Sequence, residues 1–159
     1  MIKYLRWFIL TAGAVLVFTG AAKLLSSAGG AKVLDLADPV FMFSNRHVLM
    51  FAGVVEAGVG LYCLVKRREA LQSLLVAALA TCFVAYRLGL ALMGYKGHCN
   101  CLGQLTDALG VDPALVDRLL VVALAYLLVG GYAALFLLTS RRHILKHMAG
   151  DVRQPKTER

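Results

Sequence analysis

The residues best suited to chemistry in this sequence are two cysteines one residue apart, Cys99 and Cys101. Cysteines at this spacing can bring their Cα atoms within the ~4.4–6.8 Å that a disulfide needs, but the small ring is strained, and strain makes a disulfide easier to reduce. Such a bond also closes almost no chain, so it gains little of the loop-entropy stabilisation of an ordinary disulfide. The pair therefore predicts a reversible redox centre.

The residues around this pair favour a reactive thiolate. Segment 102–109 is predicted to form a short helix, which would place Cys101 at a helix N-terminus, and Lys96 and His98 supply nearby positive charge. The helix dipole and neighbouring cations both stabilise a thiolate. A loop pair without a redox role, or two free thiols, remains the alternative interpretation.

Metal binding is the other chemistry open to this loop. His98, Cys99 and Cys101 offer three ligands suited to copper(I) or zinc. Structural zinc sites, however, use four ligands at wider cysteine spacing, so we assign no metal site here. Cys63 and Cys82 lie in apolar stretches, where cysteine usually packs as a small hydrophobe, and both are interpreted as structural.

Three charged residues within apolar stretches are further candidates, because a charge inside a bilayer is costly and usually functional. Glu56, Arg87 and Lys23 lie about 12, 9 and 3 Å below the outer ends of their stretches at the rise of an α-helix. We expect one polar cluster beneath the cysteine loop, with Glu56 paired to Arg87 or Lys23. An ion pair that only fixes the helix register explains the same residues equally well.

Four apolar stretches must position these residues. Each approaches the ~20 apolar residues that a helix needs to cross ~30 Å of hydrocarbon. With 60% hydrophobic residues and a mean hydropathy of +0.73, the chain is far more apolar than a soluble domain. We therefore predict an all-α membrane protein, a four-helix transmembrane bundle in residues 1–145 with short interfacial helices in two outer loops, followed by a basic tail at 146–159. The stretches are 7–25, 48–65, 70–93 and 119–139.

Local patterns add detail to this bundle. The second and third stretches are joined by only a few residues, so we expect them to form a tight antiparallel hairpin. Gly53, Ala57 and Gly60 would let another helix approach closely on the Glu56 side. The dipeptide at 112–113, Asp then Pro, is typical of a helix start. The first stretch is longer than the ~7–15 apolar residues of a signal peptide, so we expect it to be retained.

The distribution of charge predicts the orientation. Eleven of the 17 basic residues lie before the first stretch, between the second and third, or after the fourth. By the positive-inside rule both termini are cytoplasmic, and the two long loops, including the cysteine loop, lie outside the inner cell membrane. The net charge of +8 is thereby explained, so we expect a lipid membrane as partner and no nucleic acid.

Several of these residues together resemble a known family. Segment 19–24, TGAAKL, is similar to a signature at the end of the first span of the MauE/DoxX-like membrane proteins, and Glu56 and Arg87 lie in matching spans. Above all, segment 99–103, CNCLG, resembles the "CxCfG" segment that this family has before its last helix. Leu102 replaces the more usual phenylalanine, which leaves the thiols untouched. The resemblance covers nearly the whole chain.

The resemblance implies a function for the cysteine pair. The MauE branch is associated with methylamine utilisation, where it acts with a thioredoxin-like partner in maturing a disulfide-rich periplasmic dehydrogenase subunit. It implies here a membrane redox protein that exchanges disulfides with an extracytoplasmic thioredoxin-like protein. A weaker analogy with quinone-linked disulfide oxidases suggests a quinone as electron acceptor. A non-enzymatic membrane subunit or assembly factor, and a carrier of a metal or small molecule, remain alternatives.

Overall fold

The computed structural model describes residues 2–29, 38, 43–66, 68–94 and 112–151. In these residues the chain forms helices and no strands, and each helix is long and apolar enough to cross a membrane. The prediction of an all-α, four-helix membrane protein is confirmed. The predicted short helices in the outer loops lie outside the described residues. The helices are α1 (Ile2–Ser27), α2 (Asn45–Val65), α3 (Glu69–Leu92) and α5 (Pro113–Asp151).

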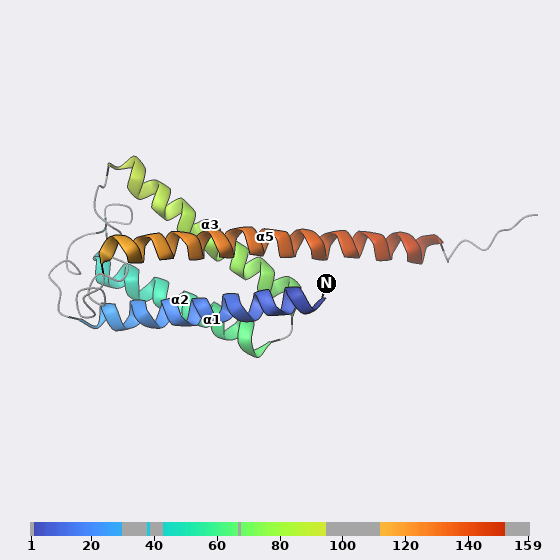
Figure 1. Cartoon of the computed structure of the whole chain (residues 1–159), viewed down its shortest axis with the longest axis horizontal. Coiled ribbons are helices and arrows are strands. Elements are labelled where there is room, and N and C mark those ends of the chain that lie inside the picture. Colours follow the sequence, from blue (N-terminus) through green and yellow to red (C-terminus); the bar gives the residue numbers. More distant parts are fainter. Residues whose placement is uncertain (1, 30–37, 39–42, 67, 95–111, 152–159) are drawn as a thin grey trace, which may run out of the picture.

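The four helices alternate in direction, so the molecule has two distinct ends (Figure 1). We call the loop end the one at which α1 and α3 finish and α2 and α5 begin. The turn end carries the start of α1, the connection between α2 and α3, and the far end of α5 (Figure 1). The described chain leaves α3 and enters α5 at the loop end, so the cysteine loop, residues 95–111, is anchored there.

Glycines hold α1 and α2 together along most of their length. A Cβ atom built on Gly20 would lie 2.7 Å from the backbone nitrogen of Ala57, and one built on Gly60 would lie 2.8 Å from the carbonyl oxygen of Gly13. Only hydrogen fits at such positions, which lets the two backbones approach as small residues do in membrane helix pairs. The prediction that small residues in the second span admit a neighbouring helix is confirmed, and the neighbour is α1.

This contact yields a matched pair of predictions for single methyl groups. Gly20→Ala should lower the free energy of unfolding by roughly 1–3 kcal/mol, because the added methyl meets backbone atoms that cannot rotate away. Gly58→Ala, on the partner helix α2 and with nothing within 4 Å of its built Cβ, should be neutral or slightly stabilising. Thermal unfolding of the detergent-solubilised variants compares them, and equal melting temperatures would contradict the close packing of α1 on α2.

The expected tight hairpin of the second and third spans is not what the structure shows. The connection is short, but α2 packs mainly on α1, and α3 packs mainly on α5. Figure 1 shows α3 crossing α5 and running away from α2 toward the loop end. The reason is that the glycines of α2, Gly53 and Gly60, pack against α1. Helix α3 instead approaches α5 at Gly131, whose built Cβ would lie 3.1 Å from Ala77. The bundle is therefore two antiparallel helix pairs.

The two pairs meet over an apolar core. Leu16 of α1, Cys63 of α2, Val76 of α3 and Leu127 of α5 are buried against one another. Polar links supplement this core, since the Thr11 hydroxyl lies 2.7 Å from the Tyr126 hydroxyl, joining α1 to α5. Burial of these apolar groups also agrees with the structural role expected for Cys63; Cys82, by contrast, is exposed on α3.

Side-chain caps define two of the helix ends. Gln72 of α3 donates hydrogen bonds of 3.0 and 2.6 Å to the carbonyl oxygens of Cys63 and Lys66, which satisfies the last turn of α2. Asp112 accepts a 3.0 Å hydrogen bond from the backbone nitrogen of Ala114, so it is the N-cap of α5, with Pro113 first in the helix. The predicted helix start is confirmed, and it leads without a break into the fourth span. At its other end α5 continues to Asp151, into the predicted tail.

Candidate functional site

A partly polar cavity of about 80 Å³ lies where all four helices meet, on the loop-end side of the apolar core. Every helix contributes to its wall, and α2 contributes a single residue, Glu56. Two aromatic rings, two cations, one carboxylate and the hydroxyl of Thr19 thus lie together in a cavity whose other lining side chains are aliphatic. The lining residues are Val15, Leu16, Thr19, Lys23, Glu56, Phe83, Tyr86, Arg87, Leu120, Ala123, Leu124 and Leu127.

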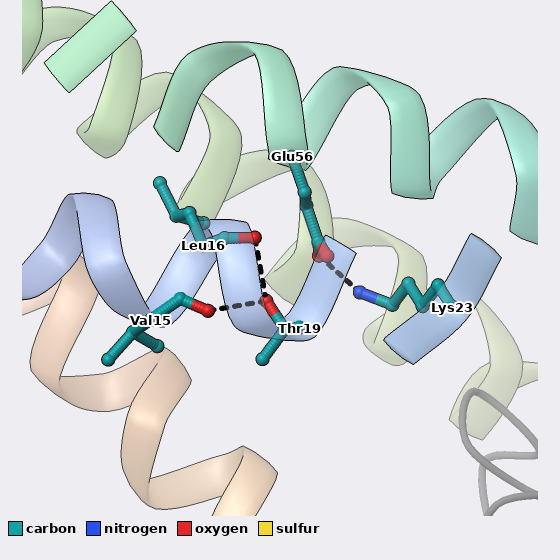
Figure 2. A network of polar contacts seen from close by, with 5 residues as sticks. All are labelled: Val15, Leu16, Thr19, Lys23 and Glu56. Carbon is teal, nitrogen blue, oxygen red and sulfur yellow. Dashed lines mark hydrogen bonds and ion pairs between the residues drawn. The ribbon is translucent and has the colours of Figure 1, made fainter. Parts of the chain in front are cut away.

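An ion pair between Lys23 and Glu56 is the most deeply buried polar feature of this cavity. The ammonium of Lys23 contacts Oε1 of Glu56, and the two residues are only 7% and 3% exposed. Figure 2 shows the Lys23 side chain extending from its place near the end of α1 to reach the Glu56 carboxylate. The same ammonium lies 4.7 Å from the centre of the Phe83 ring, a cation–π distance.

The second carboxylate oxygen of Glu56 has no such partner. Oε2 is buried and accepts no hydrogen bond among the described residues. The Thr19 hydroxyl lies near the carboxylate in Figure 2, but it donates to the carbonyl oxygens of Val15 and Leu16 at 3.0 and 3.3 Å. A buried oxygen without a donor is costly, so this one is available to a donor that enters the cavity.

The glycine contacts explain why these two charges meet. Lys23 follows Gly20 by three residues on α1, and Glu56 follows Gly53 by three residues on α2. Residues three apart lie on the same face of a helix, so the glycines that bring the backbones together also bring the charged side chains to the same interface. Of the two partners that the sequence offers Glu56, Arg87 and Lys23, the structure pairs it with Lys23.

Arg87 has a different partner from the one first considered. Its guanidinium contacts Oδ1 of Asp117 on α5, and both side chains are about one-third exposed, at 28% and 32%. Arg87 and the Lys23–Glu56 pair line the same cavity, but the structure gives Arg87 no ion pair to Glu56 among the described residues. From the sequence, Asp117 counted only as one of the acidic residues on the outer side, and no pairing with Arg87 was expected. The sequence did contain a signal for this pair. Asp117 lies one turn after the start of α5, and Arg87 lies one to two turns before the end of the antiparallel helix α3, so the two are at the same level of the bundle.

A third polar contact connects the cavity to the first loop. The Tyr86 hydroxyl donates to Oδ2 of Asp38 at 2.5 Å, and Asp38 is only 2% exposed. The backbone nitrogen of Asp38 in turn donates to the carbonyl oxygen of Phe43 at 2.7 Å. Tyr86 thus reaches from the cavity wall toward the loop end. Neither residue stood out in the sequence, because a single loop aspartate and a span tyrosine have no distinctive spacing.

Comparison with known protein families identifies the chain. The family model described as "Methylamine utilisation protein MauE" matches residues 1–142. The chain belongs to the MauE family. The match includes all four spans and every residue of the cavity. No curated protein and no solved structure matches the chain.

The chain is therefore a multi-pass membrane protein of the MauE family, whose members are described as methylamine utilisation proteins. The match is to MauE alone and leaves the wider likeness to DoxX as an expectation. The residues expected to do thiol chemistry, Lys96, His98, Cys99 and Cys101, lie outside the described residues. Among the expected supporting residues, Lys23, Glu56 and Arg87 all line one cavity.

Proposed function

We propose that this MauE family protein is a membrane thiol–disulfide exchange protein whose reactive pair is Cys99 and Cys101. The observation that carries the proposal is that the end of α3 and the start of α5, between which this pair lies in the sequence, are both at the loop end. The described chain stops after Gly94, past the end of α3, and resumes at Asp112, before α5, and these two helices supply seven of the twelve residues that line the cavity. The Arg87–Asp117 ion pair joins α3 to α5, and its two residues lie in these helices a few residues before the loop begins and after it ends.

The proposed exchange conserves atoms and electrons. A thiolate of an extracytoplasmic thioredoxin-like protein attacks one sulfur of the Cys99–Cys101 disulfide, and the second partner thiol then resolves the mixed disulfide. The partner gains a disulfide and the loop pair becomes a dithiol, so two electrons and two protons move to this protein. The strain expected in an i, i+2 disulfide favours this direction. A lipid-soluble quinone is the proposed acceptor that restores the loop disulfide.

A non-enzymatic role as a membrane subunit or assembly factor is the second candidate. The observation that favours it is the burial of the Lys23–Glu56 pair, because such a pair fixes helix register without any chemistry. In that case the cysteines shape the loop and do not cycle. Exchange of disulfides with a purified thioredoxin-like protein, followed by mass-tagging of free thiols, separates the two candidates.

The redox role requires the cysteine loop to lie outside the cytoplasm, as the charge distribution predicts. We expect a C-terminal alkaline phosphatase fusion to be inactive and a fusion within residues 95–111 to be active. The described helices support this arrangement, since the start of α1, the 66–68 connection and the far end of α5 all lie at the turn end (Figure 1). An active C-terminal fusion would overturn the topology and the compartment of the thiols with it.

A further inference from the structure

We propose that the four-helix cavity binds the oxygen-bearing edge of a quinone head group and of its reduced quinol. This inference rests on the proposed function, because only a thiol-oxidising cycle needs such an acceptor. Oxidation of the loop dithiol forms one S–S bond, breaks two S–H bonds and releases two electrons and two protons. A quinone accepts the two electrons into its ring system and one proton on each of its two oxygens, and so becomes a quinol. It also dissolves in hydrocarbon, where the cavity lies.

The polar groups of the cavity suit both redox forms. The ammonium of Lys23 and the guanidinium of Arg87 can each donate a hydrogen bond to a quinone carbonyl oxygen. The spare oxygen of Glu56 is a buried acceptor without a donor, and a quinol hydroxyl supplies that donor. Lys23 and Glu56 keep their mutual contact in either case, so ligand binding adds to the ion pair and does not replace it.

The apolar walls and the size of the cavity agree with a ring that enters by one edge. Phe83 and Tyr86 offer aromatic surfaces, and Leu120, Ala123 and Leu124 form an aliphatic side. The volume of about 80 Å³ is smaller than the ~150 Å³ of an engineered cavity that admits benzene. The cavity is partly open, however, so the remainder of the ring and its hydrocarbon tail can lie between the helices and in lipid.

Binding can be measured without the cysteines. In the Cys99→Ser/Cys101→Ser protein in lipid nanodiscs, we expect decylubiquinone or the naphthoquinone menadione to raise the melting temperature saturably, since a ligand that binds only the folded state stabilises it. The variant cannot cycle, so its response reports the cavity alone. Failure of thiol exchange in the wild type would then refute the proposed function and leave the binding site standing. Absence of a saturable shift with both quinones overturns the site.

Two phenylalanine substitutions on α5 locate the ligand. Ala123→Phe fills the cavity and should weaken binding at least about tenfold, because the ring occupies the space of the ligand. Ala125→Phe adds the same side chain two residues away at an exposed position and should leave binding unchanged. Equal shifts in the two variants would place the quinone in bulk lipid and overturn the proposal.

A third variant tests the role given to Glu56 in the same nanodiscs. Glu56→Gln leaves one acceptor oxygen, which Lys23 takes as a donor, and puts the amide NH2, itself a donor, in place of the spare oxygen, so the quinol should lose about tenfold in affinity relative to the quinone. A structural role alone would weaken both forms equally, and that result overturns this assignment. If the variant does not fold, the two α5 variants decide the question.

Discussion

Glu56→Gln should lower the free energy of unfolding by about 3–5 kcal/mol, the largest stability effect that we expect of any single substitution in this protein. The carboxylate is 3% exposed and it neutralises an ammonium that is itself buried between α1 and α2. Glutamine leaves the Lys23 charge in a low-dielectric interior without a counter-charge, and a buried unpaired charge is far costlier than a lost surface contact. Lys23→Met should be similarly damaging, because it strands the carboxylate.

The informative control removes both charges. Lys23→Met combined with Glu56→Met should be as stable as the wild type or more stable, since replacing a whole buried pair by apolar residues of similar volume is often neutral or stabilising. Asp117→Asn offers a matched comparison at a pair that is about one-third exposed, and it should cost less than Glu56→Gln. Folded yield and thermal unfolding in detergent measure all four variants. A double variant as unstable as either single variant would contradict the pairing.

The same double variant bears on function as well as on stability. If it folds normally and still supports thiol exchange, the buried pair only fixes the register of α1 on α2. If it folds normally and exchange stops, the pair is needed for turnover and not for structure. A single substitution cannot make this distinction, because it changes the fold and the chemistry of the cavity at once.

The architecture could be predicted from the sequence because the membrane imposes strong constraints. A span needs a long apolar run, so the four helices were evident, and Asp112 with Pro113 marked a helix start that the structure confirms. Charges at 23, 56 and 87 were recognisable for the same reason, since lipid makes each of them costly. All three line the cavity.

The pairing between helices was less accessible to sequence reasoning. A short connection suggested that α2 would pack on α3. Contact between membrane helices, however, depends on which helix faces carry small residues. Gly13 and Gly20 give α1 such a face, and α2 packs on it. The partner of Arg87 followed from that geometry: once α3 packs on α5, Asp117 is the carboxylate beside it. Spacing along one chain does not encode the relative rotation of two helices, so such a partner has to be found in three dimensions.

The largest functional effect is expected at the cysteines that follow α3. Replacing either Cys99 or Cys101 by serine should abolish disulfide exchange with a thioredoxin-like protein, because exchange requires one sulfur to receive the attack and the other to leave. Stability should change by no more than about 0.5 kcal/mol, since a disulfide between these residues closes almost no chain and the bundle core lies elsewhere. The matched control is Cys63→Ser with Cys82→Ser, which removes the two thiols within the spans and should keep exchange intact.

A redox titration with mass-tagged thiols measures the potential of the loop pair. It is done on the Cys63→Ser/Cys82→Ser variant, in which Cys99 and Cys101 are the remaining cysteines. The predicted i, i+2 strain destabilises the disulfide, and Lys96 and His98 stabilise the reduced thiolate. Both effects favour acceptance of electrons, so the potential should lie well above the ~−300 mV bound of structural disulfides. A pair that stays unreactive across this range, or serine variants that still support exchange, would favour the assembly-factor role, because the loop cysteines would then accept no electrons from a partner.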